Sequence, residues 1–221
     1  RGVALAVSTA CSSSAKAFAS AYRHLCMGFC DAAVVGGVDS LCLTTLYGFN
    51  ALGLASTQPC RPWDVDRDGL NVGEAAGFAL LEWAEADDTR PLLLGYGESS
   101  DAYHMTAAHP EGAGAVQAIE QALARAELGP QQVGYINVHG TATSLNDAAE
   151  DRAVLRVFGP GTPCSSTKGW TGHTLGAAGI TEAALVWLCL EHGLIPGTLN
   201  TRRIDPQLGA GVVLESRGVV A

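Results

Sequence analysis

VALAVSTACSSSAKAFASAYRHLCM, residues 3–27, is the stretch that decides the fold class. Its first five residues are apolar and include two valines, which is typical of a buried β-strand. Residues 15–27 are rich in small helix-forming side chains, and Gly28 follows at a place suited to end a helix. The stretch therefore predicts a strand that runs directly into a helix, with Cys11 at the turn between them.

The rest of the chain alternates between strand-like and helix-like patterns. The expected strands span residues 32–38, 77–83, 92–97, 133–138 and 211–215, and the strands at 77–83 and 92–97 are expected to be neighbours. The expected helices span residues 41–52, 114–127, 147–158 and 177–192, the last of them buried on most sides. Residues 56–71 contain two prolines and Asp68-Gly69, which predict a loop. This alternation indicates an α/β protein in which helices cover sheets.

Composition and charge exclude several classes of protein. The net charge of −9 and the absence of a basic run argue against a nucleic-acid partner. No apolar run reaches the length of a membrane span, and the first residues do not resemble a signal peptide, so we expect a cytoplasmic protein. The seven cysteines are odd in number and irregularly spaced, which predicts reduced thiols and neither a disulfide framework nor a zinc site.

Cys11 is the first candidate for chemistry. A cysteine at the start of a helix lies near free backbone N–H groups and the positive end of the helix dipole, which predicts a lowered pKa and a usable thiolate. The serines that follow it can cap the helix and leave room for a substrate. Taken alone, however, the position of Cys11 favours a buried structural cysteine in a strand-to-helix turn.

Two further segments each place a histidine beside glycine. NVHGTAT at residues 137–143 puts His139 at the end of an expected strand, where active-site groups of α/β folds gather. STKGWTGHTLGAAG at residues 166–179 puts Lys168 and His173 on a glycine-rich loop that opens a helix. This loop lacks the order of glycine and lysine found in a Walker motif, and it offers no second metal ligand at helical spacing.

Together with TACSSS around Cys11, these segments resemble the β-ketoacyl synthase family of the thiolase-like superfamily. RPWDVDRDGLNVGEAAG at residues 61–77 and SSDAYHMT at residues 99–106 extend the resemblance over essentially the whole chain, in the family's order. The resemblance implies part of a layered αβαβα thiolase-like fold. Residues 1–84 would be the end of the N-terminal half, with the nucleophile, and residues 85–221 most of the C-terminal half, with both histidines.

Enzymes of this family are about twice as long as this chain. The resemblance therefore implies a fragment that lacks most of the N-terminal half, the gating loop near the C-terminus and much of the acyl pocket. A sheet interrupted in this way would expose strand edges and apolar surface, so we expect that these residues do not fold alone.

The resemblance implies an acyltransferase that performs decarboxylative Claisen condensation. Cys11 would carry the acyl group as a thioester, and its own N–H would form part of the oxyanion hole. His139 and His173 would donate hydrogen bonds to the thioester oxygen of malonyl-acyl carrier protein. Lys168 would set the local electrostatics, paired with Glu150, because a buried lysine without a carboxylate tends to lose its proton.

The family's pattern assigns further positions to ligands. Thr141 and Thr143 match residues that contact the phosphopantetheine arm, which the acyl carrier protein carries, so no other cofactor is required. Asn137 and Glu182 match positions where some members hold a structural alkali-metal ion, and no other metal is expected.

Asp101 and His104 resemble the elongation type of the family, also called synthase II. Their side chains could equally form a polar strand end near a dimer interface. The expected partners are acyl carrier protein and a second subunit, either in a homodimer or in a ketosynthase-like heterodimer. Four arginines are candidates for docking the acidic carrier, or are ordinary surface residues: Arg61, Arg67, Arg202 and Arg203.

Other interpretations remain beside the synthase. A non-elongating partner subunit of the chain-length-factor type usually lacks the nucleophile, which Cys11 argues against. A degradative thiolase or an acyltransferase of the same superfamily is a further alternative. Thiolases use a second cysteine as a base near the C-terminus, and neither Cys164 nor Cys189 has such a context. An interaction module with an inactive site is the last alternative. The pathway, fatty-acid elongation or polyketide or aryl polyene synthesis, and the acyl chain length stay open.

Overall fold

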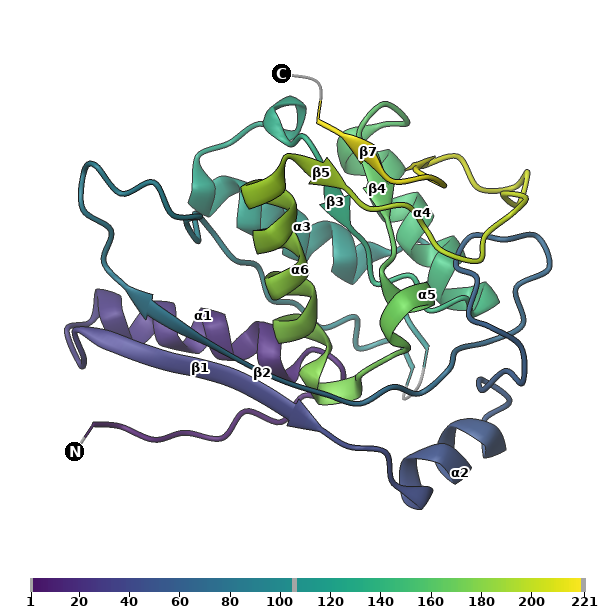
Figure 1. The fold of residues 1–221 in the computed structure, drawn as a ribbon, viewed down its shortest axis with the longest axis horizontal. Helices are drawn as coiled ribbons and strands as arrows, with labels where there is room; N and C mark the ends of the chain where they lie inside the picture. The colour runs from purple at the N-terminus through teal and green to yellow at the C-terminus, as the bar shows by residue number, and fades with distance from the viewer. Residues whose placement is uncertain (1, 105–106, 220–221) are drawn as a thin grey trace.

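The computed structural model describes residues 2–104 and 107–219 of the chain, and it has mixed α and β elements (Figure 1). The helices are α1 (Ser13–Cys26), α2 (Leu43–Ala51), α3 (Ala113–Ala126), α4 (Ser144–Phe158), α5 (Lys168–Thr171) and α6 (Ala178–His192), with short 3₁₀ turns η1 (Pro130–Gln132) and η2 (Leu175–Ala177). The strands are β1 (Ala32–Asp39), β2 (Ala75–Glu82), β3 (Ile136–Asn137), β4 (Pro163–Ser165), β5 (Leu194–Ile195), β6 (Gly211–Val212) and β7 (Arg217–Gly218).

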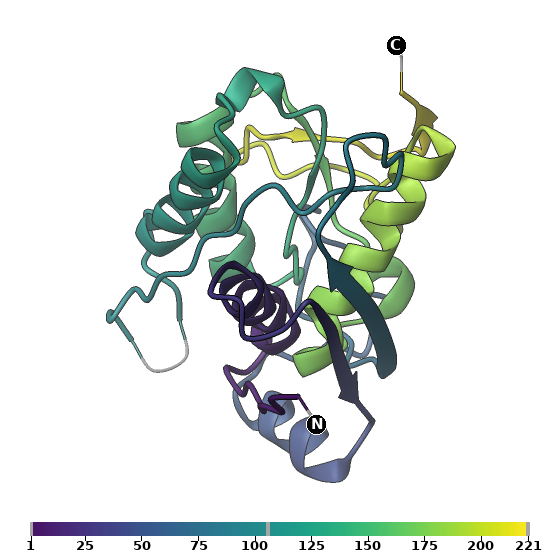
Figure 2. The same cartoon turned by 90° about the vertical axis from the view of Figure 1, so that its left-hand side faces the viewer.

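The longest strands form an antiparallel ribbon, β1 with β2, in which Ala32 pairs with Glu82 and Asp39 with Ala75. Helices α1 and α6 contact the ribbon and each other, and Figures 1 and 2 show both helices on one side of it. Gly77 lies on this covered side, where a Cβ atom would come within 2.9 Å of Ile180 Cγ1 on α6. The absence of a side chain at Gly77 therefore lets α6 lie directly against the ribbon.

A second sheet has the parallel order β3-β4-β6, and the main hydrophobic core forms beside it. Helix α4 packs on this sheet, and α3 packs on α4. The buried core side chains are Trp63, Val138, Val154, Cys164 and Ala210. Because β3 and β4 run parallel, residues that follow them emerge at the same edge of the sheet, and the segments that carry His139 and Lys168 begin there.

The predicted loop between α2 and β2 is tightly fastened to the second sheet. Trp63 is fully buried; its backbone N–H donates to Asp147 (2.9 Å) and its indole N–H to Asp151 (3.2 Å), both on α4. The carboxylate of Asp64 accepts the backbone N–H groups of Arg202 (2.8 Å) and Arg203 (3.1 Å). The loop thus connects α4 to the chain near the C-terminus through side-chain hydrogen bonds, and it forms no strand of the described sheets.

Two of the expected strands are wrong. Residues 3–7 and 92–97 are not strands, since no described residue pairs with them in a ladder, and Val3 and Leu5 are exposed rather than buried. The neighbour of β2 is therefore β1 and not the segment 92–97. Both segments have the right composition for strands, but a β-strand exists only beside a partner, which composition does not supply.

Other expectations are confirmed with shifted boundaries. The strands expected at 133–138 and 211–215 shorten to the two-residue strands β3 and β6, and the helix expected from residue 147 begins at Ser144. Helix α6 is not buried on most sides, because Trp187 and Leu190 on its C-terminal half are exposed. The division expected between residues 84 and 85 falls between β2 and α3 and stays a prediction.

Among the described residues, none of the helices is both long and apolar enough to cross a membrane.

Candidate active site

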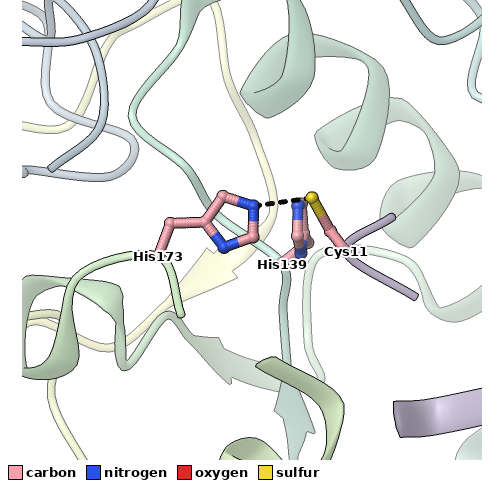
Figure 3. Close-up of side chains that lie close together, drawn as sticks. All are labelled: Cys11, His139 and His173. Carbon is pink, nitrogen blue, oxygen red and sulfur yellow. Dashed lines mark hydrogen bonds between the residues drawn. The ribbon is translucent and has the colours of Figure 1, made fainter. Parts of the chain in front are cut away.

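Cys11, His139 and His173 meet at one point, although they lie far apart in the sequence (Figure 3). Their sulfur and nitrogen atoms all lie within 4.8 Å of one another. Cys11 Sγ is 2.9 Å from His173 Nε2, and the two imidazole rings are 5.0 Å apart with planes at 87°. The resemblance predicted these three residues as a set, and the structure brings them together.

The turn that presents Cys11 is held by hydrogen bonds from its own neighbours. Ala10 has a positive φ of 54°, a left-handed conformation that a non-glycine residue adopts rarely. Ser13 Oγ donates to Ala10 O (2.6 Å) and accepts the N–H of Thr9 (2.9 Å), while Ser12 Oγ donates to Thr9 O (2.8 Å). The serines therefore shape the turn before α1 and do not cap the helix as expected.

The electrostatics of Cys11 differ from the sequence-based expectation. We expected a lowered pKa, but burial raises the pKa of the Cys11 thiol above its ordinary value. The positive charge of Lys168 acts in the opposite direction and favours the thiolate. Burial is the larger effect, because the surrounding protein covers much of Cys11 and leaves it only partly exposed to water.

His173 is oriented as a hydrogen-bond donor toward Cys11. The backbone N–H of Leu175 points at His173 Nδ1 (3.4 Å), so Nδ1 is the acceptor and Nε2 carries the proton. Burial and the charge of Lys168 lower the pKa of His173 to about 3, so the ring is neutral at physiological pH. The backbone of His173 is fixed from both sides, since its N–H donates to Asn71 O (2.7 Å) and its carbonyl accepts the N–H of Gly73 (2.9 Å).

His139 is held through its backbone by Glu150. The two oxygens of the Glu150 carboxylate accept the N–H of His139 (2.6 Å) and the N–H of Gly140 (2.8 Å). Burial lowers the pKa of His139 well below its ordinary value, and the neighbouring Lys168 and His173 add to the effect. His139 is thus a second neutral imidazole next to Cys11.

The expected ion pair between Lys168 and Glu150 is wrong. Lys168 is almost fully buried, and its ammonium forms a salt bridge with Glu182 on α6. Glu150 is occupied by the backbone of His139 and Gly140, and burial raises its pKa to about 7. The resemblance implied Glu150 as the partner, but it gave no sign that Glu182 on α6 would lie against Lys168.

A thiol and two imidazoles are also ligands that zinc accepts. Two features of His173 oppose a zinc site. Its Nε2, which faces Cys11, carries a proton, and its Nδ1 faces the N–H donor of Leu175, whereas a metal-bound histidine donates its other N–H to an acceptor. The Cys11 sulfur therefore lies beside a hydrogen-bond donor, the Nε2–H of His173.

The remaining predicted ligand positions are partly engaged. The hydroxyls of Thr141 and Thr143 hydrogen-bond to each other at 2.9 Å. Asn137 Oδ1 is buried and has no hydrogen-bond partner among the described residues, which suits an oxygen ligand of a cation. Glu182, the other residue expected at an alkali-metal site, is already paired with Lys168. The phosphopantetheine contacts and the alkali-metal ion stay predictions.

Asp101 has a structural position at the start of α3. Its carboxylate accepts the N–H of His109 (2.8 Å) and the N–H of Gly114 (2.7 Å), which satisfies a free donor of the first helical turn. His104 is among the described residues, but the matching stretch 99–106 ends in Met105 and Thr106, which lie outside them.

The four candidate docking arginines divide into two kinds. Arg67 is buried and bound to Asp205 (2.7 Å), so it is wrong as a docking residue. Arg61 lies 3.5 Å from Asp68 and is mostly covered, whereas Arg202 and Arg203 are exposed. The exposed pair is the part of the set that a partner can reach.

Two family models match the chain. The model described as "Beta-ketoacyl synthase, N-terminal domain" covers residues 1–86, and the one described as "Beta-ketoacyl synthase, C-terminal domain" covers residues 92–202. Cys11 lies in the first region, and both histidines lie in the second.

Curated relatives match nearly all of this chain but are longer. The 3-oxoacyl-[acyl-carrier-protein] synthase 2 of Vibrio cholerae is 38% identical over 230 residues, covering 97% of this chain and 55% of the relative. The mitochondrial 3-oxoacyl-[acyl-carrier-protein] synthase of Arabidopsis thaliana is 40% identical over 216 residues, covering 90% of this chain and 47% of the relative. The chain therefore spans about half the length of these curated relatives.

A solved structure agrees with the sequence matches. One chain of the complex between a ketosynthase and its chain length factor from Xenorhabdus doucetiae is 47% identical and superposes with a TM-score of 0.92. The match covers 99% of this chain and 55% of that one.

Proposed function

The chain belongs to the β-ketoacyl synthase family and has part of its thiolase-like fold, and from this premise we propose that the complete protein is a condensing acyltransferase. Its reaction would join an acyl thioester to malonyl-acyl carrier protein by decarboxylative Claisen condensation. The observation that carries the proposal is the 2.9 Å contact between Cys11 Sγ and His173 Nε2, with the neutral His139 beside it.

The first step is acyl transfer to Cys11. The sulfur attacks the carbonyl carbon of the incoming thioester, a new S–C bond forms, and the thiol of the carrier arm leaves with a proton. Sulfur attacks as the thiolate. Burial opposes this form, so the charge of Lys168 and the Nε2–H donor of His173 are the groups that stabilise it at the moment of attack.

The second step uses both histidines. In the bound malonyl thioester the bond between the carboxylate carbon and the methylene carbon breaks, carbon dioxide leaves, and the electron pair moves onto the thioester oxygen. Neutral imidazoles whose N–H groups donate hydrogen bonds to that oxygen stabilise the enolate without transferring a proton to it. The lowered pKa values of His139 and His173 keep both rings in this neutral form.

Carbon–carbon bond formation completes the cycle. The enolate carbon attacks the acyl carbonyl on Cys11, and the cysteine sulfur leaves as thiolate. The product is a β-ketoacyl thioester, two carbons longer, on the carrier arm. This order leaves Cys11 free for the next acyl group and requires no redox change.

Acyl carrier protein is the proposed partner, with its arm near Thr141 and Thr143 and its acidic surface near Arg202 and Arg203. The names of the curated relatives support a carrier-bound substrate. A second subunit, identical or ketosynthase-like, is also proposed, and the Xenorhabdus doucetiae complex supports a paired arrangement. A role as the non-elongating member of such a pair is the alternative, which the assembled Cys11 site disfavours.

Substitution of Cys11 tests the reaction in the complete protein. Cys11→Ala is expected to abolish both acyl loading and condensation, because no other group at the site can form the thioester. Acylation of Cys11 is measured by intact mass spectrometry after incubation with an acyl-loaded acyl carrier protein. Cys26→Ala, at an exposed cysteine, is the matched control. An alanine variant that is still acylated at the site would contradict the assignment.

Substitution of the histidines separates the two steps. His139→Ala and His173→Ala are expected to lower condensation by about 100-fold or more, while Cys11 is still acylated. Acylation should be slower in His173→Ala than in His139→Ala, because the thiolate then lacks the Nε2–H donor. Full elongation by either variant would overturn the proposed role of that histidine. A panel of acyl primers of different lengths in the same assay distinguishes fatty-acid elongation from polyketide or aryl polyene synthesis.

A further inference from the structure

The segment that carries Cys11 and the segment that carries His173 are fastened together at one residue, Gly176. We infer that Ser14 and Asp39 are positioning residues of the active site, which hold the turn after His173 against the turn of Cys11. This inference rests on the proposed function and names two residues that act on the reaction through His173.

Ser14 and Asp39 bind the two backbone groups of Gly176. The hydroxyl of Ser14 donates to Gly176 O (2.6 Å), and Asp39 Oδ2 accepts the N–H of Gly176 (2.9 Å). Ser14 Oγ also accepts the N–H of Ile180 (3.0 Å) in the first turn of α6. The backbone carbonyl and N–H of Gly176 are therefore both hydrogen-bonded to side chains from α1 and β1.

Ser14 and Gly176 lie close in the sequence to Cys11 and His173, so their contact affects how these two side chains are placed. Ser14 lies three residues after Cys11, within the first turn of α1, and Gly176 lies three residues after His173, in the middle of η2. Ser14 is 2% exposed, so water does not replace the contact. A shift of η2 relative to α1 would directly change the distance between Cys11 and His173.

Glycines, which have no side chain, allow the segments around Ser14 and Gly176 to come close enough for these contacts. A Cβ atom on Gly37 of β1 would lie 2.7 Å from Ser14 Cβ, and one on Gly176 would lie 3.1 Å from Asp39 Oδ2. A Cβ atom on Gly179 of α6 would lie 2.4 Å from the backbone nitrogen of Ala15. The interface is thus built for close backbone approach and tolerates little displacement.

Asp39 has a second effect that makes its role testable. Its negative charge raises the pKa of Cys11, although less than burial does. Asp39→Asn keeps an oxygen that accepts the N–H of Gly176 but removes the charge, whereas Asp39→Ala removes both. The two substitutions therefore separate the positioning of Gly176 from the electrostatics of Cys11.

The test compares these variants in the complete protein. Ser14→Ala and Asp39→Ala are expected to lower kcat for condensation by about 10- to 100-fold with little change in KM, because a misplacement of about 1 Å has an effect of this size. Asp39→Asn is expected to keep kcat within about 3-fold of wild type, as one acceptor replaces another. Ser20→Ala on the same helix and Asp31→Asn before β1 are the matched controls.

A readout that does not need condensation distinguishes failure of this inference from failure of the proposed function. The rate of Cys11 alkylation by iodoacetamide is measured against pH. Ser14→Ala is expected to move the midpoint to higher pH, because the donor His173 is displaced from the sulfur, and Asp39→Asn is expected to move it to lower pH. Alanine variants with wild-type kcat and an unchanged midpoint, or an Asn variant as impaired as Ala, would overturn the inference.

Discussion

Lys168 is the residue whose charge acts on all three side chains of the candidate active site. It is buried with its partner Glu182, it lowers the pKa of both His139 and His173, and it favours the thiolate of Cys11. Burial is the larger cause of the neutral imidazoles; the Lys168 ammonium adds to it there and opposes the effect of burial on the pKa of Cys11. The sequence predicted that Lys168 belongs to the site, but its partner is decided by the orientation of α6, which no local pattern contains.

Removal of that charge is expected to weaken the nucleophile. In Lys168→Met the pKa of Cys11 should rise further, and alkylation by iodoacetamide at pH 8 should slow by about 10-fold for each unit of the shift. The measurement is the alkylation rate of Cys11 in the complete protein between pH 6 and 10, with Arg152→Met at a surface position as the control. An unchanged midpoint would show that Lys168 does not act on the sulfur.

Glu150 makes stability depend on pH in a defined direction. Its pKa is about 7 in the folded protein, above the usual 4.5, so between these values the folded protein holds a proton that the unfolded chain has released. Stability from this group is therefore present below pH 4.5 and is lost as the pH rises through 7. The loss is up to roughly 3 kcal/mol, from the size of the shift.

Glu150→Gln tests this sign. Denaturant unfolding of the complete protein at pH 5 and at pH 7.5 gives the free energy of unfolding of wild type and variant. Wild type should lose stability relative to the Gln variant between these two pH values. A difference that stays constant with pH would contradict the buried, proton-holding Glu150.

Helices could be predicted from this sequence better than strands. Each long helix has its own pattern of apolar and small residues, and four of the five expected helices begin within two residues of the predicted position. The segments 3–7 and 92–97 have strand composition but no ladder, because pairing is decided by residues distant in the sequence. The three side chains of the candidate active site could be named from their motifs, whereas the hydrogen bonds at Gly176 could not, since they join residues more than 130 positions apart.

Close contact between α1 and α6 gives a prediction at the level of elements. Gly179→Ala should lower the free energy of unfolding by about 1–3 kcal/mol, because the new Cβ would meet the backbone of Ala15 and overpacking costs energy of this size. Gly134→Ala is the matched control, since a Cβ atom there meets nothing within 4 Å. Denaturant unfolding of the complete protein measures the free energy of unfolding of both variants. Equal stability of the two would show that the interface between α1 and α6 accommodates the added methyl group.

The ribbon of β1 and β2 is apolar on both faces. One face lies against α1 and α6, and the other presents exposed apolar side chains that share one side of the pairing register: Val34, Val38, Phe78 and Leu80. Strands that are apolar on both faces are typical of sheets covered on both sides. The length of the relatives is consistent with this, since the chain spans about half of them.

A polypeptide of residues 1–221 alone is therefore expected to bind a hydrophobic dye and to self-associate. Fluorescence of anilinonaphthalene sulfonate and size-exclusion chromatography measure the two properties. The double variant Val34→Thr, Phe78→Thr should reduce both, because it removes apolar area from the exposed face, and Thr keeps strand propensity. A monodisperse monomer that does not bind the dye would show that this face of the ribbon needs no further chain to cover it.

Cys11 lies before the connection between residues 86 and 92, and both histidines lie after it, which affects how genes of this family can be recombined. A chimera that takes the region up to residue 86 from one relative and the region from residue 92 from another receives Cys11 from one parent and both histidines from the other. Each parental region can keep its own helices and strands, yet the hybrid works only if the side chains at positions 14 and 39 suit the turn at Gly176. Selection for active hybrids should therefore recover parents that match at these three positions.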